Sequence, residues 1–219
     1  MFKFKIHQEL TCIAEGDGDF FARAGAMVAY TGQFKAEKVL LDPNQNKSML
    51  GSLVGLAARK LTGENIPIMK VTGKGSYYMA RRANHVSVIT LNKGQSLGVE
   101  SENLMAFTTD CDYKVRFIAS GIASQKGLFT TNITGKEDGA QVIVTTNGNP
   151  IVLETPCVVD PDAVVCWTGP DPGFRADVSW KTFIGQSSGE SYVMEFNNHG
   201  EVVIVQPSER QGGIDVSID

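Results

Sequence analysis

The residue types that carry most enzyme chemistry are scattered along this sequence. Its three histidines are His7, His85 and His199, and no H-x-H, H-x-x-x-H or H-E-x-x-H spacing occurs. Barrels that bind a metal ion group several histidines and an acidic residue on neighbouring strands. We therefore expect neither a metal site nor a bound cofactor.

Nucleophilic and phosphate-binding motifs are equally weak. The segment Gly185–Gly189 has the form G-x-S-x-G, but a nucleophile elbow needs a strand, a tight turn and a helix, and β-forming residues surround this segment. Gly16-Asp17-Gly18 and Gly73-Lys74-Gly75 lack the helix that would present amide groups to phosphate, and favour hairpin turns. Because no nucleophile, base and acid can be grouped, we expect a protein that is not an enzyme.

The composition indicates an all-β protein. Val, Ile and Thr supply 50 of the 219 residues, and β-branched side chains suit a pleated surface better than a helix. The formal net charge is −4, whereas nucleic-acid binders usually carry a basic surplus; we therefore expect no DNA partner and do not favour RNA. No signal-peptide core or run of about 20 apolar residues occurs, which predicts a cytoplasmic protein.

The four cysteines contain no C-x-x-C pair and lie at Cys12, Cys111, Cys157 and Cys166. Their apolar surroundings favour buried, reduced thiols. A disulfide between Cys157 and Cys166 across a hairpin is the alternative, but it would be unusual in a reducing compartment.

A short pattern recurs three times along the chain. The segments Met27–Thr31, Leu104–Thr108 and Val164–Thr168 each read apolar, apolar, small, aromatic, threonine. An apolar residue precedes each aromatic by eight positions: Ala22, Val99 and Val159. An aromatic–basic–apolar triplet follows each copy: Phe34–Ala36, Tyr113–Val115 and Phe174–Ala176. A glycine later opens a β-like run: Gly75, Gly139 and Gly200. Elements recurring in the same order indicate internal repeats.

The spacing of these elements predicts a single domain, 1–219, of three repeats. The second unit would span 68–124 and the third 125–189. The first, 1–41, would be completed by 190–219, with the strand at 200–206 joining a sheet begun by the N-terminal strands. Their aromatic residues Tyr30, Phe107 and Trp167 would each anchor one unit.

The insertion 42–67 contains the one helical candidate, with Ser48 as its N-cap and Gly63 as its stop. Its apolar residues include Leu53 and Leu56, and Arg59 and Lys60 lie in its last turn. Such an apolar face favours contact with another subunit over packing on its own sheet. Docking on a membrane or on a partner protein is the remaining alternative.

Together these motifs resemble the AIM24 family, also called domain of unknown function 124. The resemblance rests on Gly25–Val28, the Gly-rich stretch 51–63, Val159-Asp160 and the terminal Gly200–Gln206. It implies a fold akin to the tryptophan RNA-binding attenuation protein, of the double-stranded β-helix type, in which each repeat is a small β-sandwich. It also implies homotrimers that form a nine-unit ring, and it supplies no catalytic residues.

The predicted function is therefore an oligomeric scaffold or binding protein. The alternatives are a ring that binds RNA or a small molecule, and a membrane-associated partner protein. Tyr77, Tyr78, Arg81 and Arg82 combine the aromatic and basic side chains used for base stacking. Given the acidic net charge, an ordinary strand with a solvated basic end is the favoured interpretation. The basic residues of the three triplets are Lys35, Lys114 and Arg175. We expect them either to form a symmetric ring of charge or to cover neighbouring apolar faces with their stems.

Overall fold

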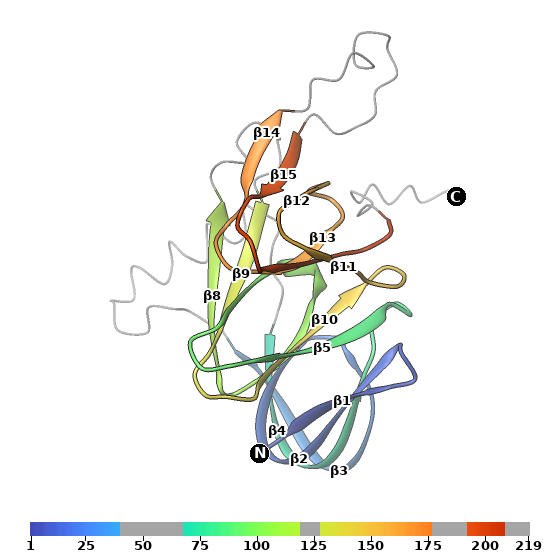
Figure 1. Ribbon diagram of the computed structural model, residues 1–219. Helices are drawn as coiled ribbons and strands as arrows, with labels where there is room; N and C mark the ends of the chain where they lie inside the picture. Colours follow the sequence, from blue (N-terminus) through green and yellow to red (C-terminus); the bar gives the residue numbers. More distant parts are fainter. Residues whose placement is uncertain (40–67, 119–127, 177–191, 209–219) are drawn as a thin grey trace, which may run out of the picture.

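The computed structural model describes residues 1–39, 68–118, 128–176 and 192–208 (Figure 1). Within these ranges the chain forms antiparallel β-strands in three sheets, with a single 3-10 turn at Ser101–Asn103. The all-β prediction is confirmed. The helix expected within 42–67 lies outside the described residues.

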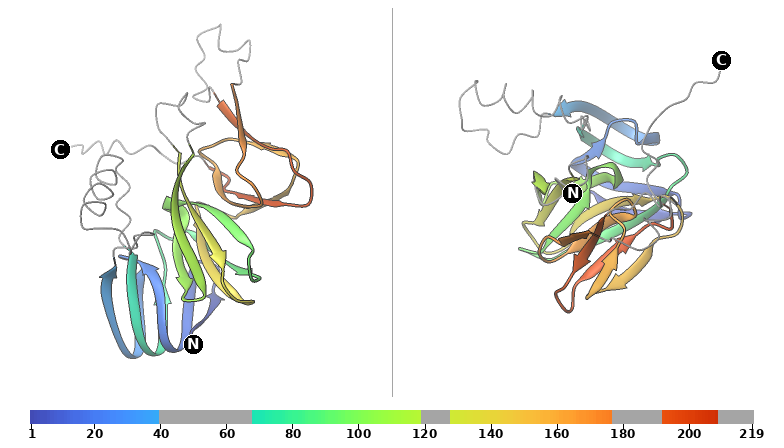
Figure 2. Two further views of the ribbon diagram at one scale, coloured as in Figure 1. Left: turned by 90° about the vertical axis from the view of Figure 1, so that its left-hand side faces the viewer. Right: turned by 90° about the horizontal axis from the view of Figure 1, so that it is seen from above.

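The first sheet contains seven strands in the order β3-β4-β2-β7-β10-β5, and β1 pairs with β2 at its side. Its strands are β1 (Lys3–His7), β2 (Thr11–Arg23), β3 (Met27–Val39), β4 (Ile68–Met79), β5 (His85–Leu91), β7 (Leu104–Thr108) and β10 (Ala140–Thr146). β2, β3 and β4 are twice as long as most of the others. Figure 2 shows them curving side by side at the N-terminal end of the molecule.

A row of glycines crosses these three long strands. Gly75 on β4 lies opposite Gly16 on β2 and Gly32 on β3, and all three have positive φ, from 111° to 149°. A Cβ on Gly75 would collide with the carbonyl of Thr31. Glycine tolerates this backbone at little cost, so segments 16–18 and 73–75, expected to form hairpin turns, instead lie within the continuous strands β2 and β4.

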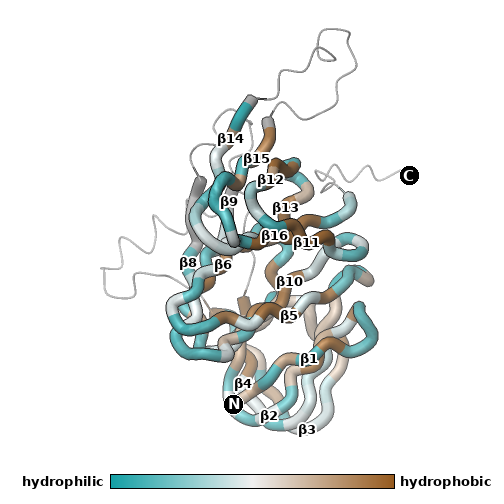
Figure 3. The backbone as a smooth tube through the Cα atoms, in the orientation of Figure 1, coloured by the Kyte–Doolittle hydropathy of each residue, from teal (hydrophilic) through white to brown (hydrophobic). Residues whose placement is uncertain are grey.

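The second sheet has the order β11-β16-β13-β6-β9-β8, and the third has the order β12-β15-β14. The strands of the second sheet are β6 (Ser96–Glu100), β8 (Cys111–Ile118), β9 (Leu128–Gly135), β11 (Ile151–Glu154), β13 (Val164–Thr168) and β16 (Val202–Val205). Those of the third are β12 (Cys157–Val159), β14 (Gly173–Ala176) and β15 (Tyr192–Phe196). Figure 3 shows hydrophobic residues along β10, β11 and β13.

Three strand pairs have the same irregular register. β3·β4, β7·β10 and β13·β16 each carry a bulge near the start of the first strand. After the bulge, the aromatic residue of each first strand faces an equivalent position: Tyr30 opposite Tyr77, Phe107 opposite Val142, and Trp167 opposite Val203. Bulges are specific features of a ladder, so a shared bulge indicates a shared local structure.

Three clusters of buried side chains follow one another along the chain. The first includes Phe20 and Tyr77, the second Phe107, and the third Trp167. Phe107 and Trp167 are each 1% exposed, as predicted. Tyr30 was expected to be their buried counterpart, but it is 50% exposed, because β3 is the last strand of its sheet.

The strand at 200–206 also departs from the prediction. β16 lies between β11 and β13 in the second sheet, and it does not pair with the N-terminal strands. The mistake arose because a glycine followed by β-forming residues indicates a strand but carries no information about its partner. Residues 209–219 lie outside the described ranges.

Candidate functional site

The aromatic residues predicted as an interaction surface divide between the core and the surface. Tyr77 and Tyr78 are neighbours on β4, so their side chains point to opposite faces of the sheet. Tyr77 is 7% exposed, and its ring lies 5.3 Å from that of Phe20. The half-buried Tyr78 lies beside His7, with 6.3 Å between the ring centroids. Tyr77 therefore belongs to the core, and the two rings do not form one stacking platform.

The two arginines after β4 also have different roles. Arg82 is exposed in the turn. Arg81 is half-buried and donates a hydrogen bond to the carbonyl of Glu102, to which Arg23 also donates, at 2.9 Å. Burial and the neighbouring Arg82 lower the pKa of Arg81. Arg81 and Arg23 thus tie the first strands to the turn that follows β6, and Arg82 is the member of the predicted set that faces solvent most freely.

The cations of the three triplets each lie beside an acidic residue. The ion pairs are Lys35 with Glu37, Lys114 with Asp112 at 3.2 Å, and Arg175 with Glu195 at 2.9 Å. Exposed pairs of this kind contribute little to stability. They do reduce the local positive charge that phosphate contacts would require.

The described residues hold no group of three or more His, Cys, Asp or Glu side chains that could bind a metal ion. No helix among them is long and apolar enough to cross a bilayer. All four cysteines are free, and Cys157 is the only one not fully buried. Burial raises the pKa of Cys12 to about 12, and it also raises that of Cys166. Neither buried thiol is suited to act as a nucleophile.

Two sets of predicted residues fall outside the described ranges. They are Leu53, Leu56, Arg59 and Lys60 of the insertion, and the G-x-S-x-G segment at 185–189. The interaction surface predicted for the insertion stays a prediction.

The outer edge of β3 carries several exposed apolar side chains. Met27, Val28 and Tyr30 are 47%, 57% and 50% exposed. They lie on a terminal strand whose single partner among the described residues is β4. Exposed apolar side chains on an unpaired edge mark a surface that another chain can cover.

The matching residues of β7 and β13 are buried. Leu104, Met105 and Phe107 are at most 1% exposed, and so are Val164, Val165 and Trp167. The same residue pattern thus lies in the interior twice and at the surface once. The difference is not in the residues but in their neighbours, because β7 and β13 have a strand on each side and β3 does not.

Each of the two buried strands is covered by a strand that precedes it in the chain. β2 pairs with β7, with Phe21 opposite Phe107 and their rings stacked 5.1 Å apart. β6 pairs with β13, with Gly98 opposite Trp167. No strand among the described residues occupies the corresponding position beside β3.

Sequence reasoning missed this edge because it treated the three copies as equivalent. The available signal was their order. If each copy is covered by a strand that precedes it in the chain, the first copy has no such strand among the described residues, and Tyr30 and its neighbours are exposed.

Comparisons with known proteins agree with the all-β architecture. A family model described as "Mitochondrial biogenesis AIM24" matches residues 4–208. A crystal structure of a Streptococcus pyogenes protein from a structural genomics consortium superposes with a TM-score of 0.66. That alignment covers 95% of this chain and 94% of the other at 18% identity, and so supports the fold alone. None of the curated proteins matches the sequence.

Proposed function

This chain belongs to the AIM24 family, and we propose that it is a non-enzymatic scaffold that works as a homo-oligomer. The observation that carries the proposal is the exposure of Met27, Val28 and Tyr30 on β3, at positions whose counterparts are buried in β7 and β13. A second copy of the chain is the partner that fits, because strands of this same sequence, β2 and β6, already cover β7 and β13.

The proposal includes three repeated units, with bounds that differ from those expected from the sequence. The shared bulge supports units at 11–79, 85–146 and 151–205. The second and third contain six strands each, β5–β10 and β11–β16, and the first contains the three long strands β2–β4. In the first unit, continuous strands with glycine bends replace the separate strands of the other two. A trimer of such chains would contain nine units, as in a ring related to the tryptophan RNA-binding attenuation protein.

Binding of RNA or of a small molecule is a weaker alternative. The burial of Tyr77 and the ion pairs at Lys35, Lys114 and Arg175 reduce the support for RNA. Attachment to a membrane or to a partner protein through residues 42–67 is the third alternative. Filter binding of mixed RNA at low salt and co-sedimentation with liposomes test the RNA and membrane alternatives directly.

Light scattering on wild type and two matched variants tests the scaffold. Val28→Asp places a charge on the exposed edge of β3. Val152→Asp places the same charge on β11, where the side chain is 62% exposed. We expect wild type and Val152→Asp to have a mass of about 71 kDa, three times the chain mass of 23.7 kDa, and Val28→Asp to be smaller. A monomeric wild type would contradict the proposal.

A further inference from the structure

We infer that the strand covering β3 is β12 of a second copy, so that chains join head to tail; this rests on the oligomer proposed above. β12 (Cys157–Val159) is the last strand of the third sheet, and its single partner among the described residues is β15. Val158 on this strand is 53% exposed. β3 and β12 are thus two terminal strands with exposed apolar side chains; among the described strands β11, with Ile151 and Val152, is another.

The two junctions inside the chain have identical registers. Ala22 on β2 lies opposite Ala106 on β7, and Val99 on β6 lies opposite Cys166 on β13. The same rule describes both pairs. The first partner stands eight positions before the aromatic residue of its own unit, and the second stands one position before the aromatic residue of the next unit. Val159 is the corresponding residue of the third unit, being eight positions before Trp167.

Extending this register identifies the expected partners. Val159 lies opposite Ala29 of the next copy, Val158 opposite Tyr30, and Cys157 opposite Thr31. The two half-exposed side chains, Val158 and Tyr30, would then cover one another. This contact is equivalent to the stacked pair of Phe21 and Phe107 within the chain.

The order of the sheets supports the same pairing. The second sheet contains six strands, β8-β9-β6 joined to β13-β16-β11. The third sheet contains only β14-β15-β12 among the described residues, which correspond to the first half of that order. Adding β3-β4-β2 of another copy beside β12 restores the six-stranded arrangement.

The buried clusters point to the same partner. Met105 and Ala106 of the second unit pack into the first cluster, and Val165 and Cys166 of the third unit pack into the second. The third cluster receives no such pair among the described residues. Val28 and Ala29 of the next copy are the residues that would fill this place.

The pairing cannot form within one chain. β3 and β12 lie at opposite ends of the molecule (Figures 1 and 2), separated by the strands of the second unit. A head-to-tail contact uses different surfaces on the two copies, and such contacts close into rings when the rotation between copies allows it.

Disulfide cross-linking tests the register with one substitution. Thr31→Cys places a thiol opposite the native Cys157 of the next copy, and directly opposite residues are within the range of a disulfide. Thr31 is exposed, so the change should not disturb folding. We expect covalent dimers and trimers on a non-reducing gel after mild oxidation, with a peptide containing position 31 linked to the peptide of Cys157.

Two controls set the specificity. Thr31→Cys combined with Cys157→Ser should give no product, and Ala29→Cys, two residues along the same exposed strand, should give far less. If the protein is oligomeric by light scattering but position 31 does not cross-link to Cys157, this interface is wrong and the proposed oligomer stands. If the protein is monomeric and no product forms, both proposals fail.

Discussion

Gly98 on β6 lies directly opposite Trp167 on β13, and the indole ring occupies the space where a side chain at position 98 would begin. This contact joins β6 to β13, at the boundary between the second and third of the proposed units. The glycine leaves room for the large indole ring of Trp167. At the matching position of the β2–β7 pair, Phe21 stands opposite the smaller ring of Phe107.

Replacing Gly98 with alanine should therefore destabilise the protein. The added Cβ would overlap Cε2 of the buried indole, and overpacking of this kind costs about 1–3 kcal/mol. A urea melt of Gly98→Ala measures the loss. Gly173→Ala is the control, because a Cβ there meets only the carbonyl oxygen of Glu195, at 3.9 Å, and an unchanged midpoint for both variants would contradict the account of this junction.

Trp167 itself should contribute strongly to stability. It is 1% exposed and packs against Phe196 with 5.8 Å between the ring centroids. Trp167→Ala should cost about 3–5 kcal/mol, since it leaves a large cavity. A loss below about 1 kcal/mol in denaturant unfolding would show that the third cluster does not depend on this ring.

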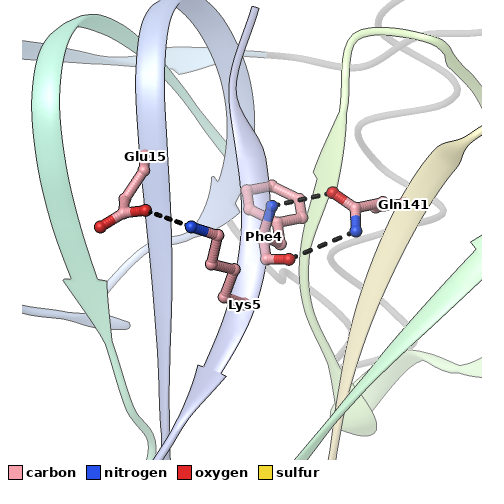
Figure 4. A network of polar contacts seen from close by, with 4 residues as sticks. All are labelled: Phe4, Lys5, Glu15 and Gln141. Carbon is pink, nitrogen blue, oxygen red and sulfur yellow. Dashed lines mark hydrogen bonds and ion pairs between the residues drawn. The ribbon is translucent and has the colours of Figure 1, made fainter.

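The side chain of Gln141 replaces a strand partner for β1. Its amide accepts a hydrogen bond from the Phe4 amide at 2.8 Å and donates one to the Phe4 carbonyl at 3.3 Å (Figure 4). Gln141→Ala should cost about 1–2 kcal/mol and speed hydrogen exchange at the Phe4 amide. Lys5→Ala removes only the exposed pair with Glu15 and should change neither; equal effects of the two changes would rule out the special role of Gln141.

Thiol reactivity should differ among the cysteines. Burial raises the pKa of Cys12 to about 12 and also raises the pKa of Cys111 and Cys166, so at pH 8 these groups remain protonated and inaccessible. We expect iodoacetamide to modify Cys157 first in the Val28→Asp variant, where the proposed oligomer is weakened and β12 is left uncovered. Mass mapping of the modified peptides checks the order, and early labelling of Cys166 would contradict the burial of β13.

Much of the fold could be predicted from the sequence, and the failures have definite causes. The β-branched composition indicated strands, and all three copies of the recurring pattern lie on strands in the structure, β3, β7 and β13. Local patterns do not specify partners, however, so the strand that begins after Gly200 was assigned to the wrong sheet. The aromatic–basic–apolar triplets also differ in register. In the second copy, the residue opposite Val99 is Thr131, which also pairs with the third residue of the triplet, Val115. In the third copy, the residue opposite Val159 is Met194, which also pairs with the first residue of the triplet, Phe174.

The candidate site was harder to predict than the core. The pattern at Met27–Thr31 recurs in two segments that are buried in the structure, at β7 and β13. The pattern alone did not indicate that its first copy would be exposed. Tyr77 and Arg81 had suitable types for nucleic-acid contact, but aromatic packing and a main-chain carbonyl engage them instead.

The mass of the freshly purified native protein tests the central claim most directly. Native mass spectrometry under gentle conditions should show a species of about 71 kDa, three chains of 23.7 kDa, with no additional mass. A protein that remains a single 23.7 kDa chain at micromolar concentration would contradict the claim that another copy covers the edge of β3.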